Sequence, residues 1–281
     1  MTWRIAIKHR SGYEYRRPVT SSYNEARISP ISSDRQLVLE AKVEISPKAT
    51  TFRYWDWWGT LVHAFDVQVP HSELVVTGTS VVETSGPPPL PETTATWADL
   101  AGAEVRDRFA ELLVATPNVP IDDYVLGCAE ELRGSRDPLD ACHQVVDWVR
   151  EQLRYERGTT TVSTKATDAL RQGTGVCQDF AHVVLALLRS LGIPARYVSG
   201  YLHPSADADV GVTTPGQSHA WVEAWVGDWW PLDPTNGSAV GPRHVVVGRA
   251  RDYTDVSPLA GIYHGGPAEA LGVTVELTRV A

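Results

Sequence analysis

The stretch Gly173–Leu191, read GTGVCQDFAHVVLALLRSL, constrains the fold of this chain more than any other. Two glycines interrupt the preceding segment, and after Cys177 apolar residues recur at three- and four-residue steps, the pattern of a half-buried helix. Gly192 and Pro194 end that helix. We therefore expect Cys177 in the first helical turn, where free backbone N–H groups and the helix dipole favour the nucleophilic thiolate. The alternative is a small buried apolar residue, because free cysteine is among the most buried residue types.

Two downstream segments favour the chemical role of Cys177. SHAWVEAWV alternates like a strand and has His219 near its start. WWPLDPTN is a short strand that ends at Asp233, before a proline turn. In a thiol acyl-transfer site a histidine takes the thiol proton, and a carboxylate holds the imidazole tautomer and stabilises the imidazolium. We therefore predict a catalytic triad of Cys177, His219 and Asp233.

This triad makes a demand on the hairpin between the two strands. A plain two-residue turn at Gly227-Asp228 would direct the side chains of His219 and Asp233 to opposite faces of the sheet. The two groups could then not form a hydrogen bond. We predict instead an odd-length turn, or a β-bulge between Ala220 and Val226, which makes the two residues diagonal neighbours on one face.

Other polar residues near these segments are weaker candidates. His182 follows the cysteine by five positions, which rotates it about 140° around the helix. His203 precedes a proline in a loop, Asp228 has the composition of a turn residue, and Asp179 lies where a carboxylate stabilises a helix start.

At these residues the sequence resembles the transglutaminase-like superfamily. The matching blocks are GVCQDFAH (Gly175–His182), RSLGIPARYVSGY (Arg189–Tyr201), SHAWVEAWV (Ser218–Val226) and WWPLDPTNG (Trp229–Gly237). The catalytic cysteine, histidine and aspartate of the family fall on Cys177, His219 and Asp233. RSGYEYRRPV, the WDWWG turn and the tail DYTDVSPLAGIYHGG resemble the β-rich N-terminal region and the closing segment of bacterial members. The resemblance implies an α+β fold, with a papain-like, transglutaminase-like core in which the cysteine helix packs on an antiparallel sheet, preceded by an all-β domain.

The resemblance also implies a chemistry. It implies thiol-dependent acyl transfer from an amide, either to an amine or to water, with a protein or peptide substrate that carries a glutamine-like or backbone amide. The alternative is a non-catalytic protein-interaction module that retains the fold. In the family, the region after residue 153 lines the cleft, so Tyr155 is a candidate for the cleft or the oxyanion hole, as is Gln178 beside the nucleophile. The firmer oxyanion donor is the backbone N–H of Cys177.

A proline-rich stretch divides the chain. Residues 1–86 carry short alternating segments separated by Pro, Gly and Ser, typical of an antiparallel sandwich or barrel. We place a linker at 87–96, because its prolines exclude a central strand or a helix interior. Residues 97–281 form the predicted catalytic domain, whose clearest helix is Asp137–Leu153. An aromatic cluster in the first domain either faces substrate or packs against the second domain: Tyr54, Trp55, Trp57 and Trp58.

Composition limits the function classes further. With 281 residues and 43% hydrophobic content, the chain can bury the core of a soluble enzyme. A net charge of −9 argues against nonspecific nucleic-acid binding. No apolar run approaches the roughly 18 residues of a membrane helix, and the start lacks the apolar region of a signal peptide. We expect no membrane or nucleic-acid partner.

Cysteine usage indicates the compartment and argues against a metal. Three cysteines, an odd number, suggest reduced thiols in the cytoplasm rather than a disulfide framework. Cys128, Cys142 and His143 do not have the spacing of a paired-ligand metal site. We therefore expect neither a metal nor a cofactor.

Overall fold

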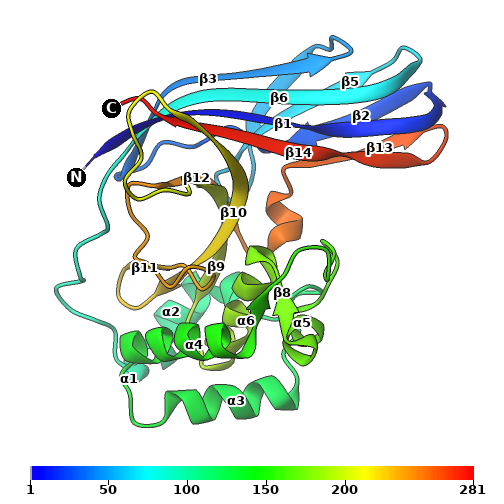
Figure 1. The fold of residues 1–281 in the computed structure, drawn as a ribbon. Helices are drawn as coiled ribbons and strands as arrows, with labels where there is room; N and C mark the ends of the chain where they lie inside the picture. The colour runs from blue at the N-terminus through cyan, green and yellow to red at the C-terminus, as the bar shows by residue number, and fades with distance from the viewer. Residues whose placement is uncertain (1) are drawn as a thin grey trace.

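The computed structural model describes residues 2–281 and places a β-rich region over a helical layer (Figure 1). The strands before the proline-rich stretch are β1 (Trp3–Val19), β2 (Ser21–Ala26), β3 (Gln36–Ser46), β4 (Thr51–Trp55), β5 (Leu61–Val67) and β6 (His71–Thr84). The helices are α1 (Trp97–Ala101), α2 (Ala103–Arg108), η1 (Ala110–Leu112), α3 (Asp123–Arg133), α4 (Pro138–Gln152), α5 (Ala166–Gln172), α6 (Cys177–Ser190) and η2 (Tyr253–Val256). The remaining strands are β7 (Arg154–Tyr155), β8 (Thr174–Gly175), β9 (Ala195–Leu202), β10 (Thr213–Trp225), β11 (Trp229–Leu232), β12 (His244–Ala250), β13 (Leu259–His264) and β14 (Ala268–Arg279).

The β-rich region is an antiparallel sandwich, as the alternating pattern predicted. One sheet contains the strand order β14-β1-β6-β3, and the facing sheet has the order β13-β2-β5-β4. Side chains from both sheets form the core between them, among them Tyr15, Val19, Phe65, Val67, Leu74 and Val76. Alternate residues of β1 point into the protein, which explains the period of two in its sequence.

The end of the chain returns to this sandwich. β13 pairs with β2, and β14 pairs with β1, so the last strands lie beside the first ones (Figure 1). The first residues of β10 pair with β14, from Thr213 with Thr278 to Gly216 with Val275. One eight-stranded sheet therefore runs through both parts of the chain. Strands of the predicted segment 97–281 pair with strands of the predicted segment 1–86.

The two ends of this large sheet meet through a side chain. The sheet has the order β12-β9-β10-β14-β1-β6-β3, with β11 added to β10. On β3, the Gln36 amide donates to the backbone carbonyl of Val246 on β12 and accepts the N–H of the same residue, both at 2.8 Å. This clamp fixes β12 on the side opposite its neighbour β9.

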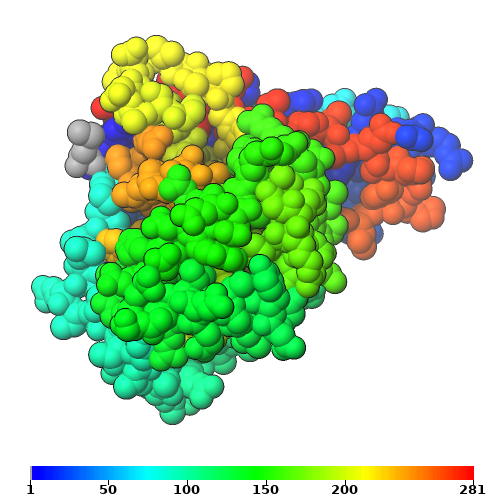
Figure 2. All heavy atoms as spheres, turned by 60° about the horizontal axis from the view of Figure 1, so that its bottom comes forward, coloured from blue at the N-terminus to red at the C-terminus, as the bar shows by residue number. Residues whose placement is uncertain are grey.

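Helix α6 is the centre of the helical layer. It contacts α3, α4 and α5 as well as the strands β9 and β10, and its residues from Gln178 to Arg189 are buried. The green segments, which contain α3 to α6, form one continuous surface in the middle of the view in Figure 2. The predicted helix Asp137–Leu153 is confirmed as α4, where the Asp137 side chain accepts the N–H of Asp140 at 2.9 Å. Among residues 2–281, none of the helices has the length and apolar character needed to span a membrane.

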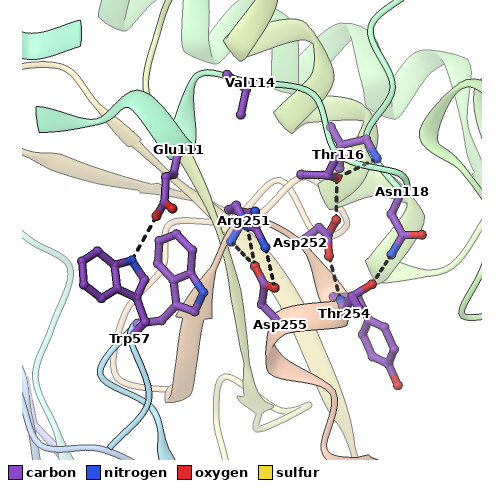
Figure 3. A network of polar contacts seen from close by, with 12 residues as sticks. Trp57, Glu111, Val114, Thr116, Asn118, Arg251, Asp252, Thr254 and Asp255 are labelled. Atoms are coloured by element: carbon purple, nitrogen blue, oxygen red, sulfur yellow. Dashed lines mark hydrogen bonds and ion pairs between the residues drawn. The ribbon is translucent and has the colours of Figure 1, made fainter. Parts of the chain in front are cut away.

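The turn between β4 and β5 connects the sandwich to the helical layer (Figure 3). The indole N–H of Trp57 donates to Glu111 at 3.0 Å. Trp58 packs against the main core, and the guanidinium of Arg251 lies 5.7 Å from its ring centroid. Trp58 thus packs against the second part of the chain, whereas Trp55 and Trp57 remain 61% and 83% exposed.

Polar contacts also hold the segment around η2 (Figure 3). Arg251 forms an ion pair with Asp255 at 2.9 Å. Two hydrogen bonds join this segment to residues 114–118: Thr116 to Asp252, and Asn118 to Thr254 at 2.8 Å. The backbone N–H of Tyr253 donates to His182 on α6 at 3.2 Å. The segment that follows β12 is therefore attached directly to the cysteine helix.

Candidate active site

Cys177 is the first residue of α6, as its sequence context predicted. The Asp179 carboxylate accepts the backbone N–H of Val176 at 2.8 Å and the hydroxyl of Thr160 at 2.7 Å. It thereby stabilises the helix start. Gly175 is required here because a Cβ atom at this position would lie 2.6 Å from the Cβ of Asp179. The thiol is thus fixed at the helix start and is partly exposed, whereas the rest of the helix is buried.

The hairpin that carries His219 and Asp233 has the predicted odd-length turn. Val222 pairs with Leu232 and Trp225 pairs with Trp229, so three residues, Val226–Asp228, form the turn. Gly227 adopts a φ of +106° in this turn, a conformation that favours glycine. His219 and Asp233 consequently lie on the same face as diagonal neighbours, and their side chains form a hydrogen bond of 2.9 Å.

The Asp233 carboxylate is buried and receives hydrogen bonds on both oxygens. Oδ1 accepts the backbone N–H groups of Thr235 and Asn236 at 3.1 and 3.2 Å. Oδ2 accepts from His219 Nε2 at 2.9 Å, from Asn236 Nδ2 at 2.8 Å and from His244 Nε2 at 3.1 Å. Asn236 Nδ2 also lies 3.3 Å from His219 Nε2, which is an approach of two donors that share one oxygen.

These contacts set the charges of the site. Burial alone would raise the pKa of Asp233, but the hydrogen bonds from His219 and His244 hold it well below its usual range. Burial lowers the pKa of His219, and hydrogen bonds and charge interactions with Asp233 and Cys177 outweigh that effect and raise it to about 9. At neutral pH the site therefore favours an imidazolium between a carboxylate and the thiol.

The proton arrangement on His219 suits a base that acts on Cys177. Asp233 occupies Nε2 of the ring, so Nδ1 is the nitrogen left to interact with the thiol. The carboxylate thus orients the imidazole and compensates the positive charge that proton transfer from the thiol creates.

Tyr155 lies near the nucleophile through strand pairing, and Gln178 directly follows it in the sequence. Tyr155 on β7 pairs with Gly175, two residues before Cys177, and is 43% exposed. The Gln178 side chain is buried and donates to the backbone carbonyl of Val162 at 3.2 Å, so it holds the 159–163 loop. A role of either residue in the oxyanion hole stays a prediction.

The weaker candidates have other partners. His182 is fully buried and accepts the backbone N–H of Tyr253, and burial lowers its pKa to about 4. His203 is buried against Trp3, with ring centroids 5.6 Å apart. The Asp228 carboxylate accepts the N–H of Trp229 inside the turn, at 2.7 Å.

Two residues of the site, Asn236 and His244, were missed in the sequence. Asn236 had a local signal, because it follows Asp233 by three residues and lies in a block that resembles the family. His244 had none, because its place depends on the pairing of β12 with β9, where it lies opposite Leu202.

One set of side chains in the site could also hold a metal ion. The ligand atoms of His219, Asp233 and His244 all lie within 4.8 Å of one another. Two histidines and a carboxylate are a ligand set that zinc accepts. The hydrogen bonds of 2.9 and 3.1 Å to Asp233 satisfy the same atoms without a metal.

A cysteine at a helix start, facing a histidine and an aspartate from adjacent antiparallel strands, defines the papain-like and transglutaminase-like class of folds. The family model described as "Transglutaminase-like superfamily" matches residues 127–234 of this chain, and the one described as "Bacterial transglutaminase-like N-terminal region" matches residues 5–83. The chain belongs to the transglutaminase-like superfamily.

Relatives and solved structures agree with this membership. An uncharacterized protein of Mycobacterium leprae is 48% identical and covers 99% of this chain and 100% of its own length. An uncharacterized protein of Mycobacterium tuberculosis is 34% identical over 98% of this chain and 93% of its own length. The crystal structure of a candidate cysteine protease from Cytophaga hutchinsonii matches 100% of this chain and 92% of that chain, with a TM-score of 0.79 and 21% identity. The predicted fold class, including the β-rich N-terminal region, is confirmed.

Proposed function

We propose that this chain is a cysteine enzyme that transfers an acyl group from an amide of a protein or peptide through Cys177, His219 and Asp233. One observation carries this proposal: His219 Nε2 is bound to Asp233 at 2.9 Å, and interactions with Asp233 and Cys177 raise the pKa of the same ring. Nucleophile, base and orienting carboxylate are thus in series, the relation that covalent acyl transfer requires. Thiol, imidazole and carboxylate together supply the chemistry, so the proposal includes no cofactor.

In the first half of the reaction, the Cys177 thiolate attacks the carbonyl carbon of the substrate amide, and a carbon–sulfur bond forms. The carbonyl oxygen becomes an oxyanion, which the backbone N–H of Cys177 at the helix start stabilises. His219 then gives its Nδ1 proton to the amide nitrogen, the carbon–nitrogen bond breaks, and an amine or ammonia leaves. An acyl group remains on the sulfur as a thioester.

In the second half, His219 is neutral and removes a proton from the acceptor. Water as acceptor gives a carboxylic acid, and a primary amine gives a new amide. In both cases the carbon–sulfur bond breaks and the pair of thiolate and imidazolium forms again. The acceptor decides whether the enzyme is a hydrolase or a cross-linking transferase.

Formation of the acyl enzyme tests this proposal directly. The protein is incubated with glutamine-containing peptides, with and without a primary amine such as cadaverine, and its intact mass is measured. We expect a thioester adduct on Cys177, which is absent in Cys177→Ala and is discharged faster when the amine is the acceptor. No adduct and no peptide turnover across the library would support the non-catalytic interaction module instead.

Selective alkylation offers a second test that needs no substrate. Iodoacetamide should label Cys177 before Cys128 and Cys142 at pH 6, because His219 remains protonated and stabilises the thiolate. Cys142 is fully buried, and burial raises the pKa of its thiol. Peptide mapping after timed labelling gives the three rates. Equal labelling of all three cysteines only after denaturation would contradict an activated Cys177.

Localisation and partners remain part of the proposal. The three cysteines are free, which is consistent with the expected cytoplasmic location. The family resemblance is the reason to propose a protein or peptide partner, and the net charge of −9 argues against a nucleic acid.

A further inference from the structure

Hydrogen bonds connect the Asp233 carboxylate to two strands. One is β10, which carries His219, and the other is β12, which it reaches through a single residue. Three of its hydrogen bonds come from Thr235 and Asn236, which lie within three residues of it and move with the same turn. His219 is the group that Asp233 has to orient. His244, on β12, is the remaining donor, at 3.1 Å from Oδ2.

The orientation of the His244 ring is fixed by its own contacts. Nδ1 accepts the backbone N–H of Gly241 at 3.2 Å, so Nε2 carries the proton and donates it to Asp233. The ring packs edge-on against Trp221, with centroids 5.3 Å apart, and the residue is only 4% exposed.

The surroundings of His244 favour its neutral form. Burial lowers its pKa, although the hydrogen bond to Asp233 opposes this effect. The charged and titratable groups that act on it are Asp233, His219 and Arg243. Because Nδ1 accepts a hydrogen bond, His244 donates a single proton from Nε2, while His219 on the same carboxylate oxygen changes its charge during catalysis.

The strand that carries His244 is held on two sides. Its backbone pairs with β9, where His244 lies opposite Leu202. Two residues further, the Gln36 side chain of β3 binds both backbone groups of Val246. The hydrogen bond from His244 on β12 thus attaches the Asp233 carboxylate to the large sheet, in addition to the contacts within its own turn.

We propose that His244 is a positioning residue of the acyl-transfer site, which holds the Asp233 carboxylate so that Oδ2 remains aligned with His219 Nε2. This inference rests on the proposed function of Cys177, His219 and Asp233. His244 acts through Asp233, and none of its hydrogen bonds involves Cys177.

Two substitutions separate the N–H donor from the packing of the ring. His244→Gln keeps an N–H near the position of Nε2, whereas His244→Leu has similar volume and no donor. The second-order rate constant for alkylation of Cys177 by iodoacetamide is measured for each, together with the melting temperature. We expect His244→Leu to lower the rate about tenfold, the equivalent of one hydrogen bond to a charged group, and His244→Gln to stay within about threefold of the unsubstituted protein.

A matched control separates this effect from loss of stability. His9 is 1% exposed and hydrogen-bonds the Tyr201 hydroxyl at 2.8 Å, and it lies on β1, a strand that carries none of the site residues. His9→Leu should lower the melting temperature by an amount similar to His244→Leu and leave the alkylation rate unchanged. If His244→Leu fails to fold, His244→Asn replaces it, because its shorter amide cannot reach Asp233.

The outcomes distinguish this inference from the proposed function. An unchanged rate in His244→Leu, or equal losses in the leucine and glutamine variants, would overturn the positioning role. Alkylation requires no substrate, so rapid labelling of Cys177 in a protein that forms no acyl adduct would refute the proposed function and leave the role of His244 measurable.

Discussion

Two buried carboxylates lie on the same part of the sheet and differ in their partners. Glu223, on β10, accepts from Arg196 on β9 and from Arg249 on β12, at 2.6 and 2.8 Å. Asp233 receives donors from β10 and β12 as well, but these donors are His219 and His244. Residues of both groups, including His244 and Glu223, line one cavity of about 610 Å³.

The pKa of each carboxyl group is lowered, so a perturbed pKa does not tell the two clusters apart. Burial would raise the pKa of Glu223, and the charges of Arg249 and Arg196 lower it instead. The guanidinium partners stay charged at any accessible pH and cannot exchange protons with a substrate. The imidazole of His219 can lose its proton, and it reaches Cys177. The kind of donor separates a proton-transfer site from a structural ion pair.

Removal of the nucleophile should leave both clusters intact and abolish the chemistry. We expect Cys177→Ala to lose all measurable turnover with little change in melting temperature, because the thiol is partly exposed at the helix start. Peptide turnover and thermal unfolding check this. Cys142→Ala is the matched control: its side chain is completely buried, so it should lose about 1 kcal/mol of stability and keep its activity.

Neutralisation of Asp233 should have the next largest effect on the reaction. In Asp233→Asn the amide can no longer fix the Nε2–H tautomer of His219, and the turnover number should fall by about 10⁴, as for a mis-set tautomer in a serine triad. The comparison is the turnover number at saturating substrate, with circular dichroism to verify the fold. Near-full activity would show that another group orients His219.

The same change at Glu223 should affect stability and not catalysis. Glu223→Gln leaves two partly buried guanidiniums without their counter-charge, and we expect the free energy of unfolding to fall by about 3 kcal/mol. Turnover of the folded protein should stay within about twofold. Urea titration and kinetics on the same preparation give both quantities. A large drop in turnover would show that the Glu223 cluster also contributes to catalysis.

Local patterns in the sequence predicted the parts of the site whose geometry is local. The apolar period of α6 placed Cys177 at a helix start, and the alternation of β10 placed His219 on a strand. An odd-length turn, or a β-bulge, was predicted because the triad needs His219 and Asp233 on one face, and faces alternate at every step along a strand. The three-residue turn meets that requirement.

Contacts that depend on distant strand pairs could not be predicted in this way. His244 reaches Asp233 only because β12 pairs with β9, and a register shift between Val246 and Gly248 interrupts that ladder. Likewise, β14 pairs with β1 from the opposite end of the chain, and no local sequence pattern predicts this pairing. Such pairings depend on the arrangement of the whole sheet.

The smallest expected effect is a pH dependence of stability that arises from His219. In the folded protein its pKa is raised to about 9, against about 6.5 in an unfolded chain. A group with a raised pKa stabilises the fold fully below pH 6.5, and this contribution is lost as the pH rises towards 9. Because Cys177 also contributes to the raised pKa of His219, the measurement is made in Cys177→Ala, where Asp233 still raises the pKa of the imidazole.

We expect the free energy of unfolding of Cys177→Ala to fall by about 1 kcal/mol between pH 6 and pH 8, since each unit of pKa difference corresponds to about 1.4 kcal/mol. Urea titrations at the two pH values give this difference. The double variant Cys177→Ala, His219→Gln lacks the titrating ring and should lose the difference, while the Glu223 cluster, charged throughout this range, is the same in both proteins. If the free energy of unfolding still fell between pH 6 and pH 8 in the double variant, another group would cause the pH dependence. The two carboxylate clusters would then not differ in proton binding in the way proposed.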